Sequence, residues 1–154
     1  LLTAILTQAL KARGILFDLP HVIHDARSKV RSAVKQRIEF SPGDFFKSMP
    51  AGASLYVMKH VVHDWNDQKA AQIRASCRRA ASKNSTLLLI DHIVCAPNQP
   101  CQSKLGDVTM LVRTGGRNRT ETEFRALLAR SGFELRRVTF TATGLGLIEA
   151  TPHE

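Results

Sequence analysis

Several features that would place this sequence of 154 residues in a familiar class are missing from it. No apolar run approaches the ~20 residues that a membrane-spanning helix needs, so we expect no membrane partner. The three cysteines form no CxxC pair and no signal peptide is visible, which predicts reduced thiols in a cytoplasmic protein. Cys77 falls on the apolar face of a predicted helix and is expected in the core, whereas Cys95 and Cys101 are expected in a loop.

Aromatic residues make up only 6% of the sequence, and acidic residues are outnumbered, with 13 Asp and Glu against 22 Lys and Arg. A net charge of +9 can indicate a nucleic-acid partner. Here the basic residues are scattered and no aromatic side chains interleave with them, which favours solvated helix faces. We therefore expect no nucleic acid as partner. A basic nucleic-acid-binding domain is the weaker alternative, and its affinity would fall steeply with salt.

The start of the sequence has no initiator methionine and no residue that could cap a first helix. Apolar residues at positions 2, 5, 6, 9 and 10 indicate an amphipathic helix that is already under way. We therefore expect the chain to be the later part of a longer protein. Its length suits one domain with a sizeable core.

The remaining sequence alternates between strand and helix patterns. Strands are predicted at 15–17, 37–40, 55–58, 86–90, 134–140 and 145–150. Helices are predicted from the start to Gly14, over 20–32, 67–81 and 103–112, and from the capping box Thr120–Glu123 to Gly132. This alternation, followed by a final hairpin, predicts an α/β fold with a doubly wound sheet.

Acidic residues follow the first two predicted strands, at the edge where ligands collect in open α/β sheets. Asp18 could accept hydrogen bonds from ribose hydroxyls, or it could cap the helix that begins at Pro20. Asp44 could be a turn residue, or it could contact an adenine base that Phe45 covers. Both alternatives stay open on these residues alone.

Histidines follow the next two strands. His60 and His63 come after the strand at 55–58, and His92 comes after Asp91 at the end of the strand at 86–90. A metal site would need a further ligand, and no HExxH or cysteine partner is present, so no metal is predicted. His60 is interpreted as structural. His63 can act as a general base, because an imidazole titrates near pH ~6.5, with Asp91 as the group that orients its ring.

Four blocks, taken in order, resemble the S-adenosylmethionine-dependent O-methyltransferases of the caffeate, hydroxyindole and bacterial polyketide-tailoring type. They are GILFDLPHV at 14–22, GDFF at 43–46, LYVMKHVVHDW at 55–65 and GGRNRTETEF at 115–124. The resemblance covers nearly the whole chain. It implies a Rossmann-like methyltransferase sheet with a C-terminal antiparallel hairpin. It also implies methyl transfer from S-adenosylmethionine to a hydroxyl, phenolic or enolic, of a small-molecule acceptor.

The resemblance also implies roles for residues at matching positions. The cofactor would be held by Asp18 at its ribose, by Leu19 packing beside it, by Asp44 and Phe45 at its adenine, and by Lys59.

The same resemblance makes His63 the catalytic base and Asp91 the acid that braces it. Asp64 and Met110 would lie beside the acceptor. Asn118 stands where the family often has an acid, and it could assist Asp91 as a hydrogen-bonding partner of the imidazole.

The family's first strand and its glycine-rich loop have no counterpart in the sequence. Residues 1–154 would then be a partial catalytic domain, without the amino-terminal dimerisation domain of a homodimeric parent. Because the absent strand is central in the family, the strands ending at Asp18 and Lys59 would have unpaired edges, and we expect the isolated chain to aggregate or re-pair. The alternative function is a non-catalytic remnant or a cofactor-binding or scaffolding fragment.

Overall fold

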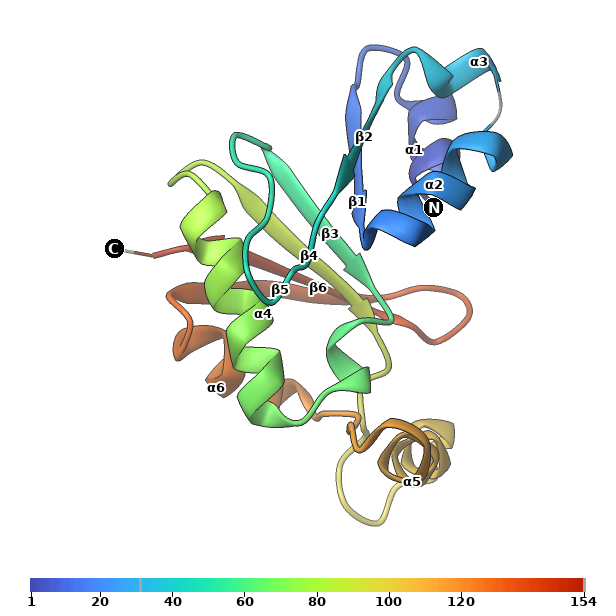
Figure 1. Ribbon diagram of the computed structural model, residues 1–154. Coiled ribbons are helices and arrows are strands. Elements are labelled where there is room, and N and C mark those ends of the chain that lie inside the picture. Colours follow the sequence, from blue (N-terminus) through green and yellow to red (C-terminus); the bar gives the residue numbers. More distant parts are fainter. Residues whose placement is uncertain (31, 154) are drawn as a thin grey trace. The chain divides into compact units, whose positions relative to one another are not determined.

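The computed structural model describes residues 1–30 and 32–153. Contacts within the chain divide it into two compact units, Leu1–Pro50 and Ala51–Glu154. Each unit has its own sheet, one with two strands and one with four (Figure 1). Residues 1–154, expected to form one partial catalytic domain, thus contain two sheets.

The first unit is a parallel pair of strands packed with short helices. Its elements are α1 (Leu2–Gln8), β1 (Gly14–Asp18), α2 (Pro20–Lys29), α3 (Ser32–Lys35) and β2 (Ile38–Pro42). Leu6, Val34 and Ile38 form its buried cluster. The helix predicted over 20–32 ends at Lys29, and Arg31 lies outside the described residues.

The second unit holds the larger sheet. Its elements are β3 (Leu55–Lys59), the 3₁₀ turn η1 (Val62–Asp64), α4 (Asp67–Ala80), β4 (Thr86–Asp91), α5 (Gln102–Thr114), α6 (Glu121–Ala129), β5 (Phe133–Phe140) and β6 (Gly146–Pro152). The strand order is β3-β4-β6-β5. β3 and β4 are parallel, and β6 is antiparallel to both of its neighbours. This confirms the predicted C-terminal antiparallel hairpin.

Burial explains why the helices of this unit form where they do. Asn66 caps α4 by accepting a hydrogen bond from the Lys69 amide at 3.0 Å. Along α4, Ala70, Ile73 and Cys77 are fully buried at helical spacing. The capping box predicted at Thr120 is present at the start of α6. Figure 1 shows α4 and α6 beside the sheet and α5 standing away from it.

The register of the sheet sets the location of the candidate site. Lys59, the last residue of β3, pairs with Ile90 of β4, and Asp91 pairs with Gly146 of β6. Because β3 and β4 run in parallel, the chain leaves β3 next to the end of β4. The segment that follows β3, including η1, therefore begins beside Asp91.

The cysteines differ in part from expectation. Cys77 is buried as predicted, and burial raises the pKa of its thiol to about 12. Cys95 and Cys101 form a disulfide, so the expectation of reduced thiols is wrong for these two. They lie six residues apart in the loop before α5, close enough for their side chains to meet. None of the helices in the described residues is both long and apolar enough to span a membrane.

Candidate active site

The turn η1 carries His63 to the end of β4. His60, which follows β3, has a φ of 54°, a left-handed conformation that is uncommon for residues with a side chain. This residue redirects the chain out of the strand direction. Val62 is then buried at 1% exposure and His63 at 9%, so the turn is fixed against the core rather than free in solvent.

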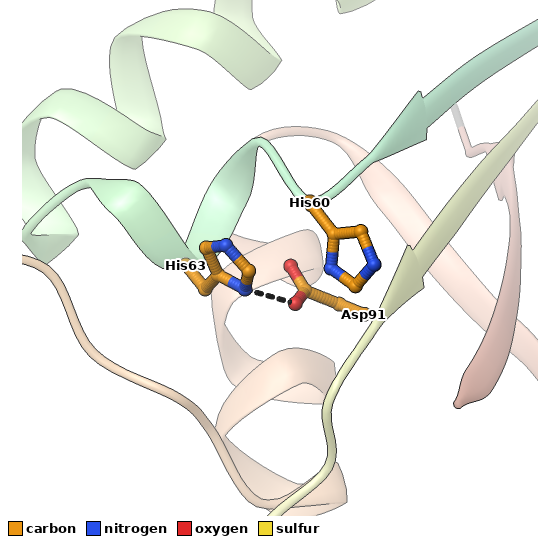
Figure 2. Close-up of side chains that lie close together, drawn as sticks. All are labelled: His60, His63 and Asp91. Carbon is orange, nitrogen blue, oxygen red and sulfur yellow. Dashed lines mark ion pairs between the residues drawn. The ribbon is translucent and has the colours of Figure 1, made fainter. Parts of the chain in front are cut away.

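Figure 2 shows His63 and Asp91 facing one another from two elements. The Nδ1 atom of His63 lies 2.6 Å from Oδ1 of Asp91. The two atoms form an ion pair when the ring is protonated. The other nitrogen, Nε2, lies 3.5 Å from Oδ1 of the more exposed Asp64. The ring is thus braced at Nδ1 by a buried carboxylate, and its Nε2 faces the more exposed Asp64.

This arrangement shifts the pKa of His63. The close contact with Asp91 raises the pKa of His63 above its ordinary value, because the carboxylate favours the imidazolium. Burial of the ring lowers the pKa and offsets part of this effect, and Asp64 adds to the rise while Arg119 opposes it. His63 therefore holds its proton to a higher pH than a free histidine does.

Two further histidines lie near this pair. The ring of His60 is 5.3 Å from that of His63 and 5.5 Å from that of His92, measured between centroids. Burial lowers the pKa of His60, so its ring favours the neutral form. His60, His63 and Asp91 have ligand atoms within 4.8 Å of one another.

This cluster has the residue types of a metal site but not its spacing. Two ligands at ~2.1 Å from a tetrahedral zinc ion would be about 3.4 Å apart. The His63 nitrogen and the Asp91 oxygen are closer than that, at 2.6 Å, and they face each other directly. The arrangement therefore favours an ion pair, and the absence of a metal site stays a prediction.

Asn118 is buried at 3% exposure but is tied to α5. Its amide Nδ2 donates to the carbonyl oxygen of Ser103 at 3.0 Å, and its backbone N–H donates to Oδ1 of Asp107 at 2.7 Å. Its Oδ1 has no partner among the described residues. The hydrogen bonds of Asn118 thus run to α5, and its predicted assistance to Asp91 stays a prediction.

The remaining predicted residues lie in both units. Lys59 is exposed at the end of β3, and Met110 is half-buried on α5. In the first unit, Asp18 ends β1, and its Oδ1 accepts from the Leu19 amide at 2.7 Å. Leu19 is 43% exposed, before α2.

Asp44 and Phe45 are half-buried after β2. Asp44 Oδ1 accepts from the Phe46 amide at 2.9 Å, which is the turn geometry that the sequence allowed. Phe45 and Phe46 contact each other edge to face, with centroids 4.9 Å apart. The other carboxylate oxygen, Oδ2, lies 4.0 Å from Nζ of exposed Lys47, and the adenine contact of Asp44 and Phe45 stays a prediction.

Comparison with known proteins gives the family. The family model of the O-methyltransferase domain matches residues 1–134. The chain belongs to this family. The chain is 42% identical over 153 residues to "Phenazine O-methyltransferase PhzM" of Lysobacter antibioticus, and the match covers 99% of this chain and 45% of the relative.

Solved structures agree with this assignment. The crystal structure of LaPhzM matches this chain with a TM-score of 0.94 and 41% identity, over 99% of this chain and 46% of that one. NcsB1 from neocarzinostatin biosynthesis, solved with S-adenosyl-L-homocysteine and 1,4-dihydroxy-2-naphthoic acid, matches with a TM-score of 0.88 and 29% identity, over 99% and 45%. The chain therefore spans less than half the length of these relatives, and its sheet has the methyltransferase fold.

Sequence reasoning missed part of the surroundings of His63. The structure places Gly116 and Arg119 against η1. It also buries Arg74 in α4 at 0% exposure. The glycine pair at 115–116 and the arginine at 119 belong to the block that carried the family resemblance, which was the available signal. Arg74 gave no signal, because its position on the helix can be either core or surface until α4 is packed.

Proposed function

We propose that the protein transfers a methyl group from S-adenosylmethionine to a phenolic or enolic hydroxyl of a small molecule, with His63 as general base. The observation that carries this proposal is the 2.6 Å contact between His63 and Asp91, which occupies Nδ1 and leaves Nε2 on the more exposed side. Membership of the O-methyltransferase family supports it. The ligands of NcsB1, a cofactor product and a dihydroxylated acid, agree with this substrate class.

His63 would supply the general base for the reaction. When bound, S-adenosylmethionine supplies an electrophilic methyl group on a sulfonium. His63 takes the acceptor's hydroxyl proton at Nε2, which raises the nucleophilicity of an oxygen whose pKa would be ~10 by analogy with tyrosine. Asp91 orients the ring and stabilises the imidazolium that forms. General base action of this kind is worth about 10²–10⁴-fold in rate.

The nucleoside end of the cofactor would be held by side chains of the first unit. Asp18 uses only Oδ1 for its local hydrogen bond, and its Oδ2 has no partner in the described residues, so it can accept from ribose hydroxyls. Asp44 and Phe45 would hold the adenine, Leu19 would pack beside the cofactor, and Lys59 of the second unit would reach it. No GxGxG motif occurs in these 154 residues to hold the methionine end.

Asp64 and Met110 would contact the acceptor. Asp64 is half-buried and next to Nε2 of His63, while Met110 offers a flexible apolar side chain. An apolar methionine beside a carboxylate would suit an acceptor with an apolar ring and a hydroxyl. Residues 1–154 as one partial catalytic domain, a homodimeric parent and a cytoplasmic location are also parts of this proposal.

A second candidate is binding of the cofactor without transfer. It is favoured by Asn118, since an amide cannot stabilise an imidazolium as a carboxylate does. The hydrogen bonds of Asn118 run to Ser103 and Asp107 rather than to His63.

The test separates binding from transfer. Calorimetry with S-adenosylmethionine and S-adenosylhomocysteine measures binding, and transfer of a radiolabelled methyl group to 1,4-dihydroxy-2-naphthoic acid and simple phenols measures activity. The proposal expects both, with His63→Ala slowing transfer strongly but leaving cofactor binding unchanged. Binding without transfer would support the second candidate. Salt-sensitive binding of nucleic acid without cofactor binding would contradict both.

A further inference from the structure

The turn that carries His63 cannot hold itself in place. η1 is three residues long, has no side-chain cap, and its internal contact from the Trp65 amide to the Val62 oxygen is long at 3.4 Å. A single 3₁₀ turn of this kind is a weak element. What fixes the turn must therefore come from another part of the chain.

That part is the loop of residues 115–119, which follows α5. The Arg117 amide donates to the His63 carbonyl oxygen at 2.9 Å. The Arg119 guanidinium donates from Nη1 to the Val62 carbonyl oxygen at 3.1 Å, and from Nη2 to that of Trp65 at 3.0 Å. The loop thus holds the backbone before, at and after His63.

Arg119 is suited to this task by its donor geometry. Its side chain is 1% exposed, and its remaining donors bond the Arg117 carbonyl oxygen at 3.1 Å and Asp67 Oδ1 at 2.8 and 3.1 Å. These five hydrogen bonds match the five N–H groups of a guanidinium. A lysine at this position could keep the charge but could not span the two carbonyl oxygens of the turn.

Gly116 brings the loop close enough for these bonds. A Cβ atom at this position would lie 2.0 Å from the His63 carbonyl oxygen and 2.5 Å from the Asp64 carbonyl carbon. These are backbone atoms, which cannot rotate away. Only a glycine lets the loop approach the turn to this distance.

The backbone of Arg119 connects to the other member of the pair. Its carbonyl oxygen accepts from the Val94 amide at 2.9 Å, and it forms an isolated parallel bridge with Ile93, two residues after Asp91. Arg119 therefore contacts the continuation of β4 through its backbone and the His63 turn through its side chain. It joins the two segments whose separation sets the contact between His63 and Asp91.

We propose that Arg119 and Gly116 are positioning residues for His63, which hold η1 at a fixed distance from the end of β4. They touch the backbone of the turn and act on the reaction through His63. The kinetic part of this inference rests on the proposed function, whereas the geometric part does not.

The test compares Arg119→Lys with the native protein. Diethyl pyrocarbonate modifies neutral imidazoles, so the pH dependence of labelling at each histidine, read by peptide mass spectrometry, reports its protonation. A loosened contact with Asp91 predicts that the His63 labelling curve moves to lower pH, while the curve of exposed His153 does not move. In the methyl-transfer assay, kcat is expected to fall about 10–100-fold with KM within about twofold, as for a misplaced reacting group.

The sign of the shift distinguishes positioning from charge. The positive charge of Arg119 by itself lowers the pKa of His63. Removing that charge in Arg119→Gln would move the His63 curve to higher pH if charge were the whole role, and to lower pH if positioning dominates. Movement to higher pH, or no movement with kcat unchanged, would overturn the proposal.

Two further variants guard against misfolding. Asp67→Asn weakens two of the bonds of Arg119 from a half-exposed side chain, and it should shift the His63 curve in the same direction by less. Arg113→Lys changes an exposed arginine on α5 and should change nothing. If neither Arg119→Lys nor Asp67→Asn moves the His63 curve in folded protein, the inference is wrong. If the native protein transfers no methyl group, the proposed function fails, but the labelling curves still test whether Arg119 positions His63.

Discussion

The imidazole of His63 and the carboxylate of Asp91 approach to 2.6 Å although 28 positions separate them in the sequence. One lies on a turn after β3 and the other at the end of β4. Parallel pairing of these strands brings their ends together, and the loop around Arg119 holds the turn.

Replacing the proposed base should remove most of the activity. We expect His63→Ala to lower kcat for methyl transfer by about 10²–10⁴-fold, because no other group would take the hydroxyl proton. Initial rates with a phenolic acceptor measure this. His153→Ala, at an exposed position near the C-terminus, is the matched control and should keep the native rate. Near-native transfer by His63→Ala would refute the role of the base.

The rate should depend on pH through His63. A general base must be neutral, so kcat/KM should rise with pH through the pKa of His63, and the contact with Asp91 places that rise above the ordinary value of 6.5. In Asp91→Asn this contact is lost and burial then favours the neutral ring. We expect the rise at lower pH, together with a lower maximal rate because the imidazolium is less stabilised.

The same contact has a consequence for folding. Because the pKa of His63 is raised in the folded protein, its stabilising contribution is complete below the unfolded value of 6.5 and is lost as pH rises through the folded pKa. Asp25→Asn, at an exposed position on α2, is the control for the pH dependence of the rate and of the stability. If the pH dependence of kcat/KM in Asp91→Asn were identical to the native one, Asp91 would not set the protonation of His63.

Replacing Asn118 with an aspartate should lower the stability of the fold. Its Nδ2 donates to the Ser103 carbonyl oxygen, and a carboxylate in Asn118→Asp would face that oxygen with no proton to donate. We expect the free energy of unfolding to fall by about 1–3 kcal/mol, measured by urea denaturation. A stability equal to the native protein would show that the side chain turns away from Ser103 at little cost.

Arg74 should be replaceable with a gain in stability. It is 0% exposed on α4, its three guanidinium nitrogens have no hydrogen-bond partner among the described residues, and burial lowers its pKa to about 10. Arg74→Met keeps an unbranched chain and removes the buried charge. We expect an increase of about 1–3 kcal/mol in the free energy of unfolding.

Thermal and urea denaturation measure this change. Arg113→Met on exposed α5 is the control and should differ from the native protein by no more than about 0.5 kcal/mol. A loss of stability in Arg74→Met would mean that the guanidinium makes interactions in solution that outweigh its desolvation.

Local sequence patterns predicted most of the elements. The continuous apolar run at 86–90 became β4, the capping box at Thr120 opened α6, and the final hairpin formed as predicted. These patterns work because burial and capping act over a few neighbouring residues. The first helix, expected to reach Gly14, ends at Gln8, because only Leu6 of α1 is buried and the rest gains little from packing.

Long-range contacts could not be predicted in the same way. The sequence named Cys95 and Cys101 as loop residues, but the disulfide depends on the path of that loop. Arg74 and Arg119 look alike in the sequence and both are buried, yet only Arg119 has partners for all its donors. Such differences arise from the packing of several elements at one point.

The sequence by itself determined the α/β class, the family resemblance, and the pairing of a histidine after one strand with an acid at the end of the next. Only the tertiary structure decided the 2.6 Å distance between them and the loop that maintains it. The reason is physical: the positions of strands follow from local apolar patterns, whereas the spacing of these two side chains depends on hydrogen bonds that a side chain more than fifty residues away donates to the backbone around η1.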